Sequence, residues 1–364
     1  MTVYDAVVLG LGIHGSATVF ELAQRGQNVV AIEQFEAGHT RGSSHGATRM
    51  IRRAYPNPIW NGLVDRAYLG WDRWSLAAGY SFVEPTTGLY AHRGAPSMQG
   101  GNSRPVSTSE WANLAPSLRP PADYNAVYDP DAGVVDAAGA IAFALAGAQN
   151  AGAELRFGET VLDWTIDDDR IVTVRTSSGP VRARKLVLAG GSWVSQLVPQ
   201  AANFFEVWRI VTLSAPSGQA VAQPPALGCF SVDLPEGLVF GLPEIAGAGA
   251  KIGIDAGEVW DPNVPVAPPT DAEVAHLADL LHQFVPGIET AGGEAISCLY
   301  TMTPDKRFVV GALPGTPEIL IAAACSGHGF KFGPAIGEAL ADLVTNVPRP
   351  DLDFLSPARL ETHV

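Results

Sequence analysis

The first residues of this sequence that could do chemistry are Gly10, Gly12 and Gly15, which form the pattern G-x-G-x-x-G. Glycines at this spacing permit a tight turn, let a pyrophosphate approach the backbone and let a helix pack closely on a strand. Glu33 lies 23 residues after Gly10, close to the spacing at which a carboxylate reaches ribose hydroxyls. The motif therefore predicts an adenine dinucleotide. FAD is favoured because a motif so near residue 1 requires later segments to complete its domain, and NAD is the alternative.

Cysteine is the second chemically interesting residue type. The sequence contains only Cys229, Cys298 and Cys325, too few and too scattered for a disulfide framework or a four-ligand zinc site. A buried cysteine is most often a small core residue. Cys298 is therefore either part of the core or a nucleophile, and its spacing alone does not decide between them.

The elements around the glycine motif can be predicted from hydrophobic patterning. Residues 3–9 form an apolar run typical of a buried parallel strand, and helical spacing of apolar residues follows up to Gly26. Further strands are expected at 28–32, 160–166, 170–176, 185–191, 237–243, 251–255 and 318–324. Helices are expected from the capping box at Thr270 and from Pro334. On the first of these, His276 and His282 fall outside the apolar stripe and are expected in solvent.

Composition restricts the possible partners. With 37 acidic and 23 basic side chains the formal charge is −14, which opposes binding to nucleic acid and to anionic membrane surfaces. No apolar segment approaches the ~20 residues needed to span a bilayer, and the N-terminus lacks the basic region of a signal peptide. We therefore expect a cytoplasmic protein of 364 residues with two domains.

Three segments together resemble the monomeric sarcosine oxidase and N-methyltryptophan oxidase family, which belongs to the D-amino acid oxidase superfamily. They are GSSHGATRMIRRAY at 42–55, CLYT followed by Pro304-Asp305 at 298–305, and SGHGFKF at 326–332. Together with the N-terminal motif, the resemblance runs along essentially the whole chain. It implies an FAD enzyme that oxidises amines at CH–NH groups.

The resemblance also implies roles for individual residues. Cys298 matches the cysteine that forms a thioether with the 8-methyl carbon of FAD, which favours a covalent flavin over a core cysteine. Arg49 and Lys251 match a basic pair close to the flavin ring, where the lysine promotes electron transfer to oxygen. A cation there would stabilise negative charge that develops on oxygen. His45 has a counterpart near the flavin, and Lys251 could otherwise be a surface residue of an edge strand.

Arg52 and Lys331 match positions that hold the substrate carboxylate, whereas Arg53 is expected to be solvated. A guanidinium and an ammonium that converge on one site form a reasonable anion site. Further flavin contacts are expected from Arg49, Lys331 and the residues Ile13, His14, Gln34, Arg41, Ser43, Ser44, Val161, Ala189, Gly190, Trp193, Gly327, His328, Gly329 and Phe330.

Two positions differ from the family pattern. Phe240 stands where sarcosine oxidases have a tyrosine, and Asp255 stands where they have a histidine near the substrate amine. Loss of the hydroxyl makes the wall more apolar, which suggests an amine with a substituent larger than methyl. Asp255 could pair with an ammonium or cap the turn before Gly257. At four residues along a strand, ~13 Å, Asp255 cannot be the salt-bridge partner of Lys251.

The sequence thus predicts a mixed α/β protein with a Rossmann-like FAD domain (1–80, 140–215 and 300–364) and an antiparallel-sheet substrate domain (81–139 and 216–299). The expected reaction removes a hydride equivalent from a secondary amino acid, most simply an N-substituted glycine. The imine then hydrolyses to a carbonyl compound and an amine, and oxygen becomes hydrogen peroxide. A monomer without metal is expected. The alternatives are an amine dehydrogenase with another electron acceptor and a non-catalytic nucleotide-binding protein.

Overall fold

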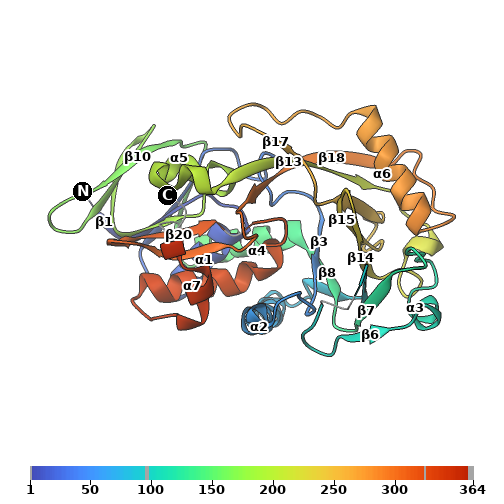
Figure 1. Ribbon diagram of the computed structural model, residues 1–364. Coiled ribbons are helices and arrows are strands. Elements are labelled where there is room, and N and C mark those ends of the chain that lie inside the picture. Colours follow the sequence, from blue (N-terminus) through green and yellow to red (C-terminus); the bar gives the residue numbers. More distant parts are fainter. Residues whose placement is uncertain (1, 95–97, 324, 360–364) are drawn as a thin grey trace.

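The computed structural model describes residues 2–94, 98–323 and 325–359. Within these residues the chain forms α/β layers with two large sheets (Figure 1). The helices are α1 (Ile13–Gln24), α2 (Asn61–Ala78), α3 (Thr108–Leu114), α4 (Ala137–Asn150), α5 (Val194–Leu197), α6 (Asp271–Phe284) and α7 (Gly333–Val344). The mixed α/β fold class predicted from the sequence is confirmed.

The first sheet contains the dinucleotide motif. Its strands are β1 (Val3–Leu9), β2 (Val29–Glu33), β9 (Glu154–Phe157), β10 (Val161–Ile166), β11 (Val172–Thr176), β12 (Gly179–Leu188), β19 (Val309–Leu313) and β20 (Thr316–Ala323). Strand β1 lies between β12 and β2, and all three are parallel. Their apolar side chains are buried because helices α1, α4 and α7 pack on one another beside this sheet (Figure 1).

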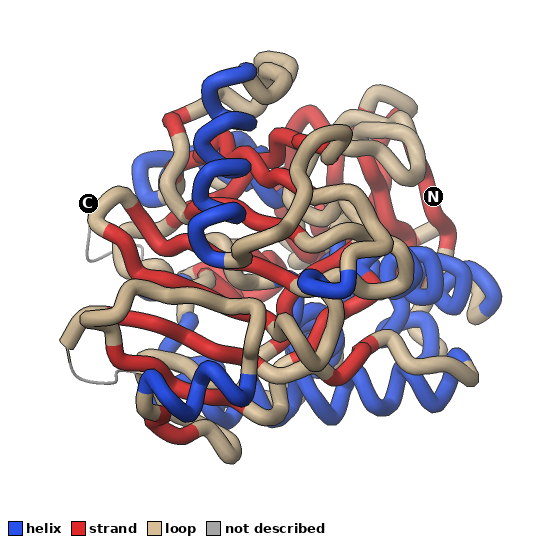
Figure 2. The backbone as a smooth tube through the Cα atoms, turned by 90° about the vertical axis from the view of Figure 1, so that its right-hand side faces the viewer, coloured by secondary structure: helices blue, strands red, loops and turns tan. Residues whose placement is uncertain are grey.

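The second sheet forms a wall beside the first. Its strands are β5 (Gly88–His92), β6 (Arg104–Val106), β7 (Asn125–Asp129), β13 (Glu206–Ser214), β14 (Cys229–Leu234), β15 (Gly237–Leu242), β16 (Lys251–Ile254), β17 (Glu258–Val259) and β18 (Glu294–Met302). Helix α6 lies on one face of this sheet (Figure 2). It packs there through Leu277, Leu281 and Phe284. The opposite face is therefore free to line a cavity.

A small third sheet joins β3 (Thr48–Ile51), β8 (Gly133–Asp136) and β4 (Val83–Pro85) in the order β3-β8-β4. It holds the basic segment, because β3 contains Arg49 and leads directly to Arg52. Strand β13, within the predicted 140–215 segment of the FAD domain, pairs with β16, β17 and β18 of the second sheet. The division into two domains stays a prediction.

Several predicted boundaries shift slightly. The strand predicted at 185–191 ends at Leu188, and the strand predicted from Arg170 begins at Val172, because Arg170 adopts a positive φ of 61° in a turn. Ala324, at the end of the predicted strand 318–324, lies outside the described residues. The capping box at Thr270 is confirmed, as is the exposure of His276 and His282.

Candidate active site

One large cavity joins the segments singled out in the sequence. Its volume is about 1270 Å³, above the ~300–1,000 Å³ of most small-molecule sites. It runs from the glycine motif, past Arg49 and Cys298, to the second sheet. The volume and the length of this lining suit a dinucleotide together with a second, smaller molecule.

The glycine motif has the geometry that a dinucleotide requires. Gly10 has a φ of +86°, and a Cβ added there would lie 2.5 Å from the Ala189 carbonyl oxygen. A Cβ on Gly15 would overlap the Gly10 carbonyl, so Gly15 allows α1 to pack on the turn and does not itself line the cavity. The Ile13 N–H donates to Ser44 Oγ over 3.1 Å. Only glycine fits at positions 10 and 15, as expected from the motif.

Glu33 ends β2 beside this turn. Its Oε2 accepts from the Leu11 N–H at 2.9 Å, and Oε1 lies 3.7 Å from His39 Nε2. Burial alone would raise the pKa of Glu33, but the neighbouring His39 ring and the hydrogen bond from the backbone of Leu11 outweigh it, and the net pKa is lowered. The carboxylate is therefore ionised at neutral pH and can accept hydrogen bonds from ribose hydroxyls.

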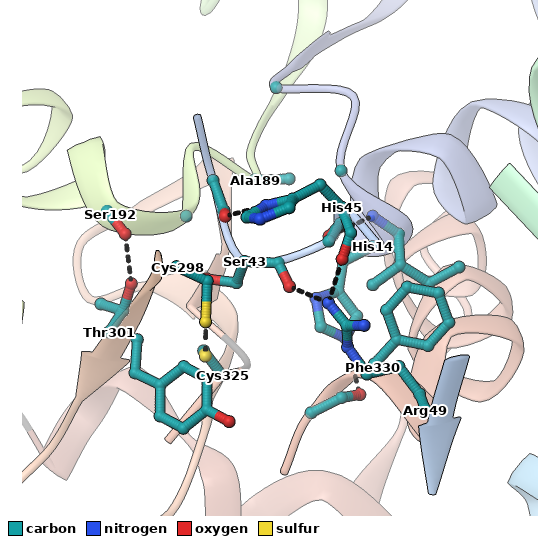
Figure 3. Close-up of a pocket in the computed structure, with 18 of the residues that line it drawn as sticks. His14, Ser43, His45, Arg49, Ala189, Ser192, Cys298, Thr301, Cys325 and Phe330 are labelled. Carbon is teal, nitrogen blue, oxygen red and sulfur yellow. Dashed lines mark hydrogen bonds between the residues drawn. The ribbon is translucent and has the colours of Figure 1, made fainter. Parts of the chain in front are cut away.

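Cys298 lies on β18 and lines the centre of the cavity. Figure 3 shows that its sulfur points toward Cys325, with Ser43 beside the pair. Burial raises the pKa of the Cys298 thiol to about 11, although the charges of Arg49 and Lys251 oppose this. Both thiols are free, and Cys325 donates weakly to Ser43 Oγ at 3.8 Å. A reaction of Cys298 as a nucleophile would thus need an electrophile close by and the help of these two cations.

Three residues with basic side chains, Arg49, Lys251 and His45, line the cavity together with Cys298. Arg49 donates to the carbonyls of Ser43 (2.7 Å), His45 (2.5 Å) and Thr48 (2.8 Å) and lies over the ring of Phe330 (Figure 3). Lys251 is 8% exposed and donates to the Thr48 carbonyl at 2.9 Å.

Burial and the charge of Arg49 lower the pKa of Lys251 to about 7. His45 Nδ1 donates to the Gly42 carbonyl at 2.9 Å, and burial lowers the pKa of the ring. Lys251 lines the cavity, as the alternation along its strand allows, and because it is buried it is not a surface residue.

A second cationic centre contains Arg52 and Lys331. Lys331 Nζ donates to the His328 carbonyl at 2.7 Å and to Tyr55 Oη at 3.2 Å. Burial, and then the charge of Arg52, lowers the pKa of Lys331 well below its usual range. The guanidinium of Arg52 lies 5.0 Å from the ring centre of Tyr55 and 5.2 Å from that of Tyr90, and its buried Nε has no hydrogen-bond partner in the described part of the chain. Such a centre is built to bind an anion.

Phe240 and Asp255 lie on the wall formed by the second sheet, and both line the cavity. Asp255 Oδ2 pairs with Lys306 Nζ at 3.2 Å. As expected from the spacing, Lys251 is not its partner. Phe240 stands beside Gly253, where an added Cβ would lie 2.5 Å from the ring.

The remaining predicted flavin contacts fall into two groups. Those that line the cavity are His14, Gln34, Ser43, Ser44, Val161, Ala189, Gly190, Trp193, Gly327, His328, Gly329 and Phe330. Arg41 does not line it and lies exposed over the ring of Phe35. The predicted contact of Arg41 with the flavin is therefore not supported. Arg53, which is predicted to be solvated, forms ion pairs with Asp65 and Asp131.

The structure also places residues in the cavity that the sequence did not indicate. They come from strands of the second sheet, from the segment before α2 and from the loop between β18 and β19: Trp60, Thr212, Ser231, Asp233, Leu238 and Lys306. The polar residues Ser231 and Asp233 alternate with buried Phe230 and Val232 on β14, and this alternation is the one local signal that could have revealed them.

A Rossmann-type turn and a cavity with a second, anion-binding centre define a dinucleotide-dependent enzyme of small molecules. The chain belongs to the FAD dependent oxidoreductase family, whose model matches residues 5–343. It is 31% identical to the monomeric sarcosine oxidase of Streptomyces avermitilis, with 98% of each chain aligned. It is 29% identical to the N-methyl-L-tryptophan oxidase of Salmonella heidelberg, again over 98% of each.

Solved structures share the fold. NikD, described as an unusual amino acid oxidase essential for nikkomycin biosynthesis, superposes with a TM-score of 0.84 at 23% identity, covering 98% of each chain. The L-proline dehydrogenase of P. horikoshii superposes with a TM-score of 0.83 at 21% identity, covering 99% of this chain and 98% of the other. No helix among the described residues is long and apolar enough to cross a membrane.

Proposed function

We propose that the protein oxidises a secondary amino acid, most simply an N-substituted glycine, and passes the electrons through FAD to oxygen. The products are an imine, which water converts to a carbonyl compound and an amine, and hydrogen peroxide. The observation that carries this proposal is the pairing in one cavity of a dinucleotide cradle with a buried anion site, Arg52 and Lys331. The sarcosine oxidases and N-methyltryptophan oxidase to which the chain is similar support it.

Arg52 and Lys331 bind the carboxylate of the substrate. The Arg52 side chain is held between two tyrosine rings, so little side-chain entropy is lost on binding. Lys331 is fixed by the His328 carbonyl and by Tyr55. The charge of Arg52 also favours loss of the proton from a bound ammonium, and the neutral amine is the form that can be oxidised. A flavin-reduction rate that shows no amine ionisation over pH would contradict this step.

Lys251, Arg49 and His45 act on the oxygen side of the reaction. They lie within one group of backbone carbonyls, those of Gly42, Ser43, His45 and Thr48, which keeps their side chains in place. A fixed positive charge stabilises the negative charge that develops as oxygen accepts electrons. When bound, FAD supplies the two-electron acceptor for the amine.

Cys298 would hold FAD covalently in this proposal, through a thioether to its 8-methyl carbon, and oxygen would be the final acceptor of the two hydrogens lost from the thiol and the methyl group. The thiol lines the cavity next to Arg49 and Lys251, whose charges favour its thiolate.

The apolar ring of Phe240 accommodates an N-substituent larger than methyl. The protein acts as a monomer in the cytoplasm, with no nucleic acid or membrane partner.

The test is anaerobic mixing of the yellow protein with a panel of N-alkyl glycines, imino acids and glycated amino acids. We expect at least one to bleach the flavin absorbance, and readmitted air to restore it with formation of peroxide. Bleaching without recovery in air would favour a dehydrogenase with another acceptor. Pigmented protein that no secondary amine bleaches would indicate a non-catalytic nucleotide-binding protein.

A further inference from the structure

The cavity wall on the second sheet is organised in three rows of side chains that cross the strands. Leu242 and Lys251 are cross-strand partners in the first row, and Phe240, Gly253 and Thr212 are neighbours in the second. In the third row the Asp255 N–H donates to the Leu238 carbonyl at 2.9 Å, and Leu238 is opposite Asp233. Because side chains on one face recur every second residue, the rows are ~6.7 Å apart.

The rows differ in chemistry and in depth. The first row holds the buried cation Lys251, whereas the second row is dominated by the ring of Phe240. The third row holds two carboxylates, Asp255, which is half-buried, and Asp233, which is exposed. The wall therefore runs from a cation deep in the cavity, across an apolar stretch, to acids near its mouth.

Asp255 is only partly satisfied. Its Oδ2 contacts Lys306, a side chain that is 58% exposed, and exposed pairs of this kind are weak. Its Oδ1 is buried and has no hydrogen-bond partner among the described residues. Oδ1 also lies 3.0 Å from the position of a Cβ at Gly327, so a side chain at position 327 would crowd it. A carboxylate oxygen held in this way is an acceptor that lacks a donor.

The unpaired atoms of the cavity are complementary. Within the described residues, Arg52 Nε is a buried donor without a partner, and Asp255 Oδ1 is a buried acceptor without one. Both side chains adjoin the 325–331 segment, because Asp255 approaches it at Gly327, and Tyr55, over whose ring Arg52 lies, contacts it at His328. A ligand that bears an anion at one end and a cation at the other would satisfy both atoms.

We propose that Asp255 determines specificity and selects a secondary amino acid whose side chain or N-substituent ends in a second positively charged group. This proposal rests on the proposed function, in which Arg52 and Lys331 bind the carboxylate. The methylenes of the substituent cross Phe240 and Leu238, and its ammonium or guanidinium replaces Lys306 at Asp255. The position of Asp255 in the outer row favours such a terminal group over the reacting amine, which would lie deeper in the cavity, toward Lys251 and Cys298.

The test compares two substrates that differ only in the terminal ammonium group, Nα-methyl-L-lysine and Nα-methyl-L-norleucine. The measured quantity is the ratio of kcat/KM for flavin reduction in the holoenzyme. We expect a preference of about tenfold or more for the lysine derivative, the factor of one charge-assisted hydrogen bond. Asp255→Asn should abolish this preference, whereas Lys306→Met should increase it, because a competing cation is removed.

Asp233→Asn is the matched control, since it removes the same charge from the exposed end of the same row, and the ratio should not change. The proposal would be overturned if the kcat/KM ratio of the two substrates were the same in the wild type and in Asp255→Asn. If that equal ratio came with a parallel loss of kcat/KM for both substrates, Asp255 would lie at the reacting amine. Equal effects of Asp255→Asn and Lys306→Met would show that the ion pair is merely structural. If no amine, sarcosine included, bleaches the flavin, the proposed function fails as a whole.

Discussion

Replacement of Lys251 by methionine tests the oxygen side of the proposed reaction. Lys251 is buried, and its pKa is lowered to about 7, so near neutral pH it titrates between a charged and a neutral form. A negative charge that arrives on a reduced flavin raises this pKa, so the midpoint in the reduced enzyme lies at or above 7. The charged form is the one present below the midpoint. The rate of reoxidation by oxygen should therefore be high at low pH and fall as pH rises through the midpoint.

The magnitude follows from the loss of one preorganised charge. Removal of a single such group from a water-excluded site typically costs ~10²–10³ in rate, and Lys251→Met should slow reoxidation by about this factor below the midpoint. Its residual rate should also lose the pH dependence. The assay is stopped-flow mixing of reduced enzyme with oxygenated buffer from pH 6 to 10.

Two results would refute the reasoning. One is a variant that reoxidises as fast as the wild type, and the other is a wild-type rate that rises with pH across the midpoint. Lys306→Met is the matched control, because it removes an exposed lysine of the same cavity, and it should leave reoxidation unchanged.

Two further predictions concern the cofactor and the anion site. Gly10→Ala should give protein with little bound flavin, measured by absorbance, because the new Cβ would lie 2.5 Å from the Ala189 carbonyl oxygen. Gly26→Ala is the control, because Gly26 has a similar positive φ but open space around it, and this variant should remain yellow. A yellow Gly10→Ala protein would argue against this cradle. Arg52→Met should raise KM for sarcosine-like amino acids by about a hundredfold, the effect of removing one partner of a buried charged pair, and should barely affect amines that lack a carboxylate. Equal loss for both kinds of amine would assign Arg52 a structural role.

Local signals explain which parts of the fold could be predicted from sequence. The strand at Val3–Leu9, the glycine turn and the capping box at Thr270 depend on neighbouring residues, and the structure shows them as expected. The strand predicted up to Gly191 ends at Leu188 because Ala189 and Gly190 turn to contact Gly10. That contact joins residues far apart in the sequence.

The substrate wall is the part that local signals could not reveal. Asp233 and Asp255 meet across Leu238 only because β14, β15 and β16 are adjacent, and the order of strands in a sheet is not encoded in any one of them. The row that contains Thr212 likewise requires β13 to lie beside β16. Arg41, by contrast, lies close in sequence to the flavin-contact segment yet points to solvent.

Attachment of FAD at Cys298 is tested most directly by the mass of the acid-denatured protein. The account predicts a polypeptide heavier than the bare chain by one FAD, with the extra mass on the peptide that contains Cys298, and its loss in Cys298→Ser. Pigmented protein that releases all of its flavin in acid and leaves a chain of unmodified mass would contradict it.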